Sequence, residues 1–335
     1  MIIERQTING DIQKISITFE TGSSYKLISQ GASLTRWKSN DGTDIVAGYQ
    51  DYDDYKDAGM YLGTCIGMTA GRIAFGKCVV AGKAIHFQSK SKHFLHGGDQ
   101  GLNFINFEVV SVRQENDTAV VEFSTTVKPK VFGGLASIKI IYLINNNGFR
   151  LNFEVSASNS ILCNLTNHSY FNLDGDFSYG LNNHKLQVNA SKAVMVDENI
   201  LGTDIIDVKG SVFDFKKDKS LAKALKENYF FGHPAKGLDH FFILDDHEKP
   251  AIILTSKKSH RVLEVKTSYP GVTLYTTNYP TIKILQNGQA MAFHGAIAIE
   301  PQYQSNAVND HRFENYLLQP EEIYSHFIDY RLREE

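Results

Sequence analysis

The stretch from residue 137 to residue 155 reads Ser137-Ile138-Lys139-Ile140-Ile141-Tyr142-Leu143-Ile144-Asn145-Asn146-Asn147-Gly148-Phe149-Arg150-Leu151-Asn152-Phe153-Glu154-Val155. Apolar and polar residues alternate on both sides of its Asn-rich centre, and a period of two is typical of a half-buried β-strand. The central Asn-Gly is a turn signal, because these residues adopt positive φ at little cost. The stretch therefore predicts an antiparallel β-hairpin.

Similar strand patterns lie on both sides of this hairpin. Alternation recurs at 14–19 and at 119–124. Further along the chain, Asn287-Gly288 separates the apolar segments 282–285 and 290–293, which predicts a second hairpin. Strand signals at such short intervals favour an all-β chain.

Helical patterns are few. Residues 218–226 contain good helix formers with leucines four apart, and residues 309–318 allow a turn or two. Neither segment suits repeated crossovers between parallel strands. We find no linker, repeat or low-complexity segment. The predicted fold is one domain over residues 1–335, a large antiparallel β-sandwich with few short helices.

Composition excludes several classes of protein. Hydrophobic residues make up 42% of the 335 residues, enough for a large core and without the signature of disorder. A formal net charge of −3 with scattered Lys and Arg gives no reason to expect nucleic acid as a partner. No signal-peptide pattern or membrane-spanning run is visible, so we expect a cytoplasmic protein without a membrane partner. Cys65, Cys78 and Cys163 lack paired spacing and are expected to be reduced, buried thiols.

Two residues are candidates for acid–base chemistry. His168 lies in the stretch Leu165–Leu173, which crowds Asn, Ser and Thr side chains into an apolar strand-like segment. Hydrogen-bonded core polarity is the structural alternative for it. Glu300 ends an apolar alternation, and a buried carboxylate is costly unless it is paired. An imidazole and a carboxylate together supply the groups for paired proton transfer near neutral pH.

Three other residues occupy positions where a ligand can be bound. His96 precedes two glycines, which suits a strand that ends in a loop close to a ligand. Arg72 lies between small and apolar residues, where a guanidinium must be paired or must hold a ligand. Asp239 begins a probable strand. For each of them the residues alone leave open a structural role, as a turn residue or a partner in an ion pair.

Taken in order, five motifs resemble those of the aldose 1-epimerase family, the galactose mutarotases, and the resemblance covers most of the chain. The family patterns are Ala-Asn-Arg-Ile, Leu-His-Gly-Gly, Thr-Asn-His-x-Tyr-Phe-Asn-Leu, Asp-His-x-Phe, and Glu-x-Gln followed by Asp-Ala-x-Asn. Here they read Ala70-Gly71-Arg72-Ile73, Leu95-His96-Gly97-Gly98, Thr166 to Leu173, Asp239-His240-Phe241-Phe242, and Glu300-Pro301-Gln302 followed by Asn306-Ala307-Val308-Asn309. Single motifs are weak evidence, whereas five in order are specific.

The chain also departs from the family pattern at four positions. Gly71 stands where an asparagine that touches sugar is common, and Met68 replaces an arginine. Asn306 replaces an aspartate, and Phe107 replaces a tryptophan. The lost asparagine side chain at Gly71 bears on substrate preference, since one hydrogen bond to a hydroxyl contributes roughly 0.5–1.5 kcal/mol.

The resemblance implies a galactose mutarotase-like supersandwich that interconverts the α and β anomers of a free aldohexose, either galactose or glucose or both. By resemblance, Glu300 is the base and His168 the acid. Arg72, His96, Asp239 and Gly71 are implied in substrate binding. A nearby carboxylate is expected to keep His168 protonated near pH 7. No cofactor and no metal are expected, because only protons move, and the chain is expected to act as a monomer or a homodimer.

Three alternatives stay open. A hexose-6-phosphate 1-epimerase needs a cluster of basic residues for the phosphate, and only Arg72 stands near the motifs. A catalytically silent sugar-binding protein of the same fold has no need for both Glu300 and His168. A metal-dependent sugar isomerase can use imidazole and carboxylate ligands, but no metal-ligand spacing is present.

Overall fold

The computed structural model describes residues 1–57, 59–89 and 91–334, and its sheets are built from antiparallel strands. The largest sheet has nine strands. In spatial order they are β10 (Glu108–Glu115), β11 (Thr118–Val127), β12 (Ala136–Asn145), β13 (Gly148–Ala157), β27 (Tyr324–Glu334), β23 (Arg261–Thr267), β22 (Ile252–Ser256), β17 (His184–Val188) and β20 (Lys219–Ser220).

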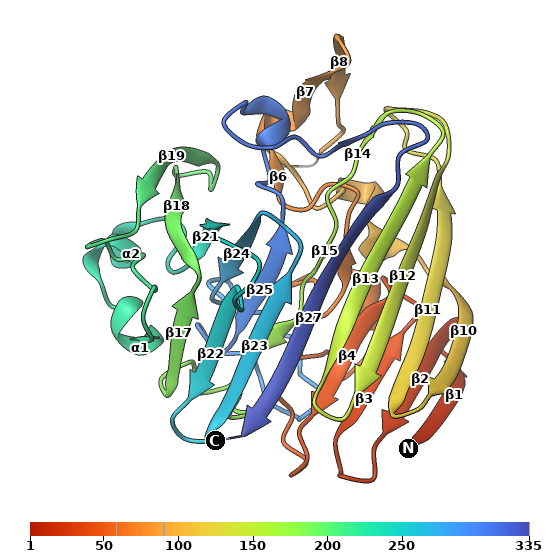
Figure 1. The fold of residues 1–335 in the computed structure, drawn as a ribbon, viewed down its shortest axis with the longest axis vertical. Helices are drawn as coiled ribbons and strands as arrows, with labels where there is room; N and C mark the ends of the chain where they lie inside the picture. The colour runs from red at the N-terminus through yellow and green to blue at the C-terminus, as the bar shows by residue number, and fades with distance from the viewer. Residues whose placement is uncertain (58, 90, 335) are drawn as a thin grey trace.

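Two smaller sheets lie behind the nine-stranded sheet (Figure 1). The six-stranded one has the order β16 (Tyr170–Phe171), β25 (Ile297–Gln302), β24 (Gly271–Tyr275), β21 (Asp239–Leu244), β18 (Ala190–Val196) and β19 (Gly202–Asp207). The four-stranded one has the order β1 (Ile2–Ile8), β2 (Ile12–Thr18), β3 (Ser24–Ile28) and β4 (Ser33–Lys38). The predicted large antiparallel β-sandwich is therefore confirmed.

Several short two-stranded sheets accompany these larger ones. They are β14 (Ile161–Leu162) with β26 (Leu317–Leu318), β15 (Thr166–Asn167) with β5 (Cys65–Ile66), β6 (Arg72–Ile73) with β9 (Phe94–Leu95), and β7 (Lys77–Val80) with β8 (Lys83–His86). Two of these pairs, β15 with β5 and β6 with β9, carry or adjoin the residues that the sequence motifs single out.

Aromatic rings join the layers of the sandwich. Trp37 of β4 is fully buried and lies edge-on to Phe149 of β13, with ring centroids 5.6 Å apart. Phe171 of β16 contacts Tyr330 of β27 at 5.2 Å, and the Tyr330 hydroxyl donates to the carbonyl of Ile299 in β25. Burying one large apolar side chain stabilises a fold by roughly 1.5–3 kcal/mol. These rings therefore fix the nine-stranded sheet against both smaller sheets.

The hairpin predicted at 137–155 is present, with Asn145 opposite Gly148 at its end. Gly148 is required for close approach, because a Cβ there would lie 2.0 Å from the carbonyl oxygen of Tyr330. The second predicted hairpin is only a turn. Gly288 has the expected positive φ of 81°, but its flanks form one isolated bridge, between Ile284 and Ala290, rather than paired strands.

The helices are short. They comprise α1 (Leu221–Ala224), α2 (Asn228–Gly232) and the 3-10 turns η1 (Tyr52–Lys56), η2 (Ala74–Gly76), η3 (Gly98–Gln100), η4 (Leu102–Phe104) and η5 (Ala307–Asn309). The predicted helix at 218–226 is confirmed only as α1, because Lys219 and Ser220 pair with β17 instead. Residues 309–318, expected to allow a turn or two, contain the end of η5 and a turn in which the Phe313 N–H donates to the Asp310 carbonyl, and they end in β26. Within the described ranges, none of the helices has the length and apolar character of a membrane span.

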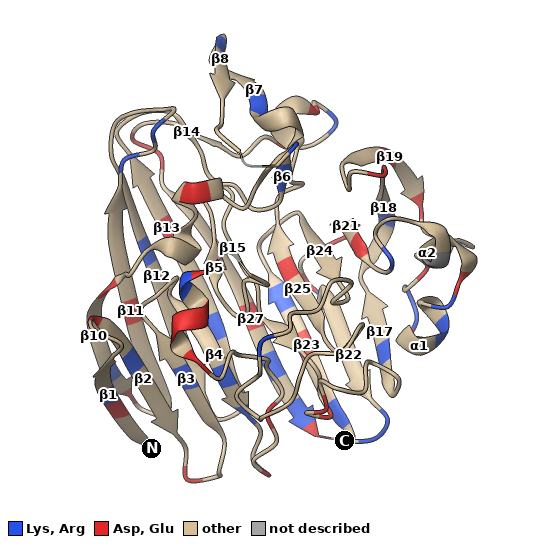
Figure 2. Ribbon diagram, turned by 180° about the vertical axis from the view of Figure 1, so that it is seen from behind, with Lys and Arg blue, Asp and Glu red and all other residues tan. Residues whose placement is uncertain are grey.

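Charged residues of both signs are interspersed over the ribbon in both halves of the molecule (Figure 2). Ion pairs join many of them, such as Lys56 with Asp53 and Lys130 with Asp99. Exposed pairs of this kind contribute about 0–1 kcal/mol each, so they affect solubility more than the fold.

Candidate active site

His168 lies between the two-residue strands β15 and β16, where the chain passes from one sheet to another. The stretch Leu165–Leu173, expected as one strand-like segment, is thus interrupted at the histidine. The His168 N–H donates to the carbonyl of Thr64, and its own carbonyl accepts from the N–H of Gly63, both at 2.9 Å. These two bonds fix the main chain of His168.

The asparagines around His168 have structural partners. Asn164 accepts from the N–H of Tyr303 at 3.0 Å, Asn167 donates to the carbonyl of Gly63 at 2.9 Å, and Asn172 donates to the carbonyl of Gly295 at 2.8 Å. Buried amides of this kind are satisfied core polarity. The asparagines in this stretch therefore have a structural role as hydrogen-bonded core residues.

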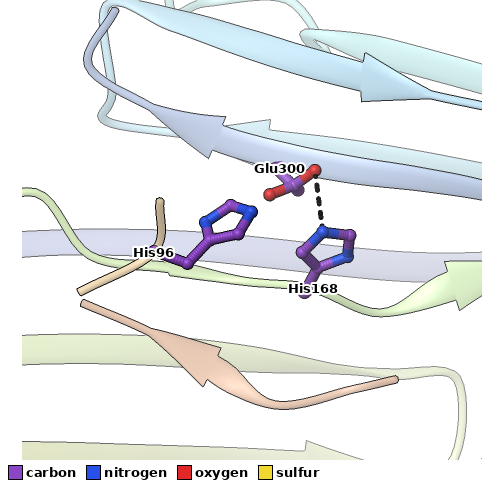
Figure 3. A group of neighbouring side chains, drawn as sticks. All are labelled: His96, His168 and Glu300. Carbon is purple, nitrogen blue, oxygen red and sulfur yellow. Dashed lines mark ion pairs between the residues drawn. The ribbon is translucent and has the colours of Figure 1, made fainter. Parts of the chain in front are cut away.

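Strand register brings His168 to Glu300. Tyr170 pairs with Ala298 where β16 meets β25, so extending this antiparallel register by two residues sets position 168 opposite position 300. The His168 Nε2 atom is 3.4 Å from the Glu300 Oε1 atom (Figure 3). Only 5% of His168 and 3% of Glu300 is exposed. The two residues predicted as an acid–base pair are thus in contact and almost removed from solvent.

Burial changes the protonation of this pair. It raises the pKa of Glu300 well above the usual range, with Asp239 adding to the rise and Arg72 opposing it. It lowers the pKa of His168 to about 3. With no proton the pair holds a buried carboxylate, and with two it holds a buried imidazolium. Both states are disfavoured, so the pair holds one proton over a wide pH range.

This result corrects one sequence-based expectation. Glu300 was expected to keep His168 as an imidazolium near pH 7, but desolvation of the imidazolium is the largest effect on the His168 pKa and acts in the opposite direction. A ring enclosed among aromatic side chains is poorly hydrated: His168 lies parallel to Tyr170 at 4.9 Å and to Tyr61 at 5.9 Å. Sequence motifs carry no information about this enclosure.

His96 follows β9 and adopts a left-handed backbone, with φ of 52°. Its Nδ1 atom accepts a hydrogen bond from the Gly71 N–H at 3.1 Å. Burial, together with His168 and Arg72, lowers the pKa of His96 well below the usual range, so the ring is neutral and its proton lies on Nε2. Figure 3 shows one edge of this ring turned toward Glu300. His96 is therefore a fixed N–H donor at this site.

These three side chains also form the one candidate metal cluster among the described residues. One ligand atom each from His96, His168 and Glu300 lies within 4.8 Å of the others, and two imidazoles with a carboxylate suit Zn²⁺. However, the Gly71 N–H fixes His96 in the tautomer whose Nε2 carries a proton. A metal needs an unprotonated ring nitrogen. The hydrogen bond from Gly71 to His96 therefore favours hydrogen bonding to an oxygen over binding of a metal.

Arg72 and Asp239 lie in the same region. Arg72 in β6 and Asp239 at the start of β21 approach to 3.8 Å between Nη1 and Oδ2. Burial raises the pKa of Asp239, and the Arg72 guanidinium partly offsets this rise. The ion pair that was the structural alternative for both residues is thus present, but at 3.8 Å it is longer than a hydrogen bond, so among the described residues polar atoms of both side chains are left to bind a ligand.

All of these side chains line one cavity of about 220 Å³. This is smaller than the ~300–1,000 Å³ typical of sites for drug-sized ligands. Aromatic residues form part of its wall: Tyr61, Tyr170, Phe241, Tyr275 and Tyr279. Tyr170 lines the cavity, whereas its neighbour Phe171 and the strand residue Phe242 are fully buried in the core.

Sequence reasoning missed several polar lining residues, namely Thr273, Gln302, Gln304 and Ser305. Gln302 and Gln304 follow Glu300 at alternate positions, so the strand period of two was the signal that could have identified them. Thr273 pairs with Glu300 across β24 and β25, and sequence alone does not give that register.

The four departures from the family pattern have different surroundings. Gly71 lines the cavity, whereas Met68 and Phe107 are not among the described residues that line it. Asn306 has a structural role, because its Oδ1 accepts from the Ala74 N–H at 3.1 Å and from the Asn309 amide at 2.9 Å. An aspartate would offer the same acceptor, so this exchange preserves the loop.

Comparison with known proteins gives one consistent result. Residues 13–331 match the family model described as aldose 1-epimerase. A human galactose mutarotase is 31% identical over 97% of this chain and 92% of its own length. An aldose 1-epimerase from Haemophilus influenzae is 29% identical over 94% of each chain. The crystal structure of a GalM/aldose epimerase homologue from C. elegans superposes with a TM-score of 0.84 at 28% identity, covering 96% of this chain and 98% of the other.

Proposed function

Because the chain belongs to the aldose 1-epimerase family, whose members are carbohydrate epimerases, we propose that it equilibrates the α and β anomers of a free aldohexose, galactose or glucose. The observation that carries this proposal is the buried contact between His168 and Glu300. Anomer exchange needs a base at the C1 hydroxyl and an acid at the ring oxygen. Both oxygens are bonded to the same carbon, so the two catalytic groups must lie side by side, and a separation of 3.4 Å meets this requirement.

Glu300 is the proposed base and His168 the proposed acid. Moving the pair's single proton from Glu300 to His168 leaves its net charge unchanged, and Arg72 favours the form in which Glu300 is ionised. Glu300 then takes the proton of the C1 hydroxyl while His168 protonates the ring oxygen, and the ring bond at C1 breaks to give an aldehyde. Rotation about C1–C2 and closure with the roles exchanged gives the other anomer.

The remaining polar groups are proposed to hold the sugar. His96 presents its Nε2–H, Arg72 presents several N–H donors, and Asp239 accepts from hydroxyls. Gly71 contributes through its N–H, which orients His96. Tyr275 and Tyr61 supply apolar faces against which a sugar ring can stack. This distribution of donors and acceptors suits a neutral polyol.

Two alternatives are less well supported. A sugar phosphate needs several positive groups, yet Arg72 is the one Lys or Arg among the described residues that line the cavity, and it faces Asp239. A silent sugar-binding protein gains nothing from burying Glu300 against His168, since each charged form is costly there. We therefore favour catalysis on the free sugar. Proton transfer alone requires no cofactor.

Polarimetry tests the proposal. Freshly dissolved α-galactose and α-glucose are followed at a pH where spontaneous mutarotation is slow, with and without the protein. Faster decay to the same end point is expected, and the ratio of kcat/KM values ranks the sugars. No acceleration with either sugar, combined with acceleration of a hexose 6-phosphate, would replace this proposal by the phosphate alternative. Sugar binding without acceleration of any substrate would favour the silent protein.

A further inference from the structure

Gly71 and Ser305 meet at the wall of the cavity. Both line it, and they come from segments more than 200 residues apart in the sequence. Gly71 has a φ of 76°, and a Cβ built on it would lie 2.2 Å from the Cβ of Ser305 and 3.1 Å from its Oγ. Real side chains do not approach so closely. Only one of these two positions can therefore carry a side chain, and here it is position 305.

The main chain around Ser305 is fixed. The Ser305 carbonyl accepts from the Tyr316 hydroxyl at 2.6 Å. On either side, Gln304 accepts from the Asn306 N–H at 2.8 Å, and Asn306 accepts from the Ala74 N–H at 3.1 Å. The last of these bonds joins the loop to the segment that follows Arg72. Ser305 is thus held against Gly71 by contacts that do not use its own hydroxyl.

The Ser305 hydroxyl itself is available for a ligand. Ser305 is half-buried, and within the described ranges its Oγ has no hydrogen-bond partner in the protein. Gly71 is bonded to Arg72 along the chain and to His96 through its N–H. The hydroxyl therefore lies on the same wall of the cavity as two of the proposed sugar-binding residues.

We propose that Ser305 is a substrate-binding and specificity-determining residue whose hydroxyl bonds one sugar hydroxyl from the place that a side chain at position 71 would otherwise fill. This inference rests on the proposed function, since it assumes a sugar in the cavity. A serine hydroxyl both donates and accepts, so it suits a sugar hydroxyl, which does the same. The short Ser305 side chain also leaves more room in the cavity beside Gly71 than an asparagine side chain at position 71 would.

Ser305→Ala tests the contact, because it removes one oxygen and nothing else. We expect kcat/KM for the preferred aldose to fall about 3- to 10-fold, the effect of one neutral hydrogen bond. The decisive measurement uses the 2-, 3-, 4- and 6-deoxy forms of that aldose. The deoxy sugar that lacks the contacted hydroxyl should show no loss in Ser305→Ala, whereas the other three should lose the same factor as the parent sugar.

Ser160→Ala is the matched control. Ser160 is half-buried, bonds Gln319 at 2.6 Å and is not among the residues that line the cavity, so its kcat/KM should equal that of the parent. Equal losses on all deoxy sugars in Ser305→Ala would overturn the proposal, because the loss would then be structural. Unchanged kcat/KM on every sugar would also overturn it.

A reciprocal exchange tests the steric relation between the two positions. Gly71→Asn alone should lose more than 10-fold in kcat/KM, because its Cβ would collide with Ser305. Adding Ser305→Gly should recover much of the loss and change the ranking of sugars, since asparagine tolerates a left-handed backbone. A double variant no better than Gly71→Asn would contradict the proposal. If the unaltered protein accelerates no sugar, the proposed function fails and not merely the role of Ser305.

Discussion

The rate of catalysis is expected to be nearly independent of pH between 5.0 and 7.5. If the pair gained its second proton with the reference histidine pKa of ~6.5, about 3% would stay in the one-proton form at pH 5.0, and kcat/KM would fall about 30-fold from its value at pH 7.5. Burial instead lowers the pKa of His168 to about 3, so about 99% of the pair stays in the one-proton form at pH 5.0. His96 adds no inflection in this range, because its pKa is also lowered.

Initial rates by polarimetry at pH 5.0, 6.0 and 7.5, corrected for spontaneous and buffer-catalysed mutarotation, measure this profile. The fold is followed in the same buffers by the fluorescence of Trp37, the one tryptophan, which is buried between the sheets. A fall of tenfold or more between pH 7.5 and 5.0 with unchanged fluorescence would refute the reasoning. It would mean that His168 is better hydrated than its enclosure by Tyr61 and Tyr170 implies.

Further predictions concern single residues. Glu300→Gln should lower kcat by roughly 10²–10⁴, the usual contribution of a general acid or base, because the amide cannot take a proton. The melting temperature should not fall, since the amide fills the same space. A kcat near that of the parent would remove Glu300 from catalysis. Asp239→Asn should raise KM by about tenfold or more, because a charge-assisted hydrogen bond to the sugar is lost, and it should change kcat less. An unchanged KM in initial-rate assays would count against this contact. His184, which accepts from the Leu173 N–H at 2.9 Å, has its pKa lowered by burial to about 4. Below pH ~6.5 the unfolded chain thus binds a proton at this position that the folded chain does not. The free energy of unfolding therefore decreases as the pH is lowered, by about 3 kcal/mol between pH 7 and pH 4. Urea unfolding at both pH values should show a decrease smaller by about that amount in His184→Gln, and an identical decrease would contradict the linkage.

The sequence predicted the fold well where local pattern and tertiary pairing agree. The hairpin at 137–155 alternates along its length and became β12 and β13. Prediction failed where chain pairing overrode a local preference. Residues Lys219 and Ser220 have helical neighbours but complete an edge of the nine-stranded sheet. Residues 282–293 have apolar character and a good turn, yet Ile282 is 93% exposed and gains no partner strand. The extent of a single domain over the chain stays a prediction.

For the site, the motifs predicted which residues meet at one cavity but not their protonation. His168, Glu300, His96, Arg72 and Asp239 all line one cavity. Their pKa values depend on burial, which arises only when distant segments close over them. Gly71 also shows this limit, because the sequence reports a missing side chain but not the serine, 234 positions later (305 − 71), that fills its space.

The interruption of the strand at His168 explains why so many polar residues surround one reactive group. A histidine inside a regular ladder would have its neighbours fixed by strand pairing alone, but the two-residue strands β15 and β16 leave the main chain of His168 bonded to Gly63 and Thr64. Asn167 strengthens this junction through the Gly63 carbonyl. Tyr61, two residues before Gly63, is held at a φ of 57°, a conformation that costs of order 1 kcal/mol or more. Its ring lies parallel to that of His168. The polar crowding around His168 is therefore structural, and its effect is to hold an ionisable ring in an apolar enclosure, where it can keep one proton in common with Glu300.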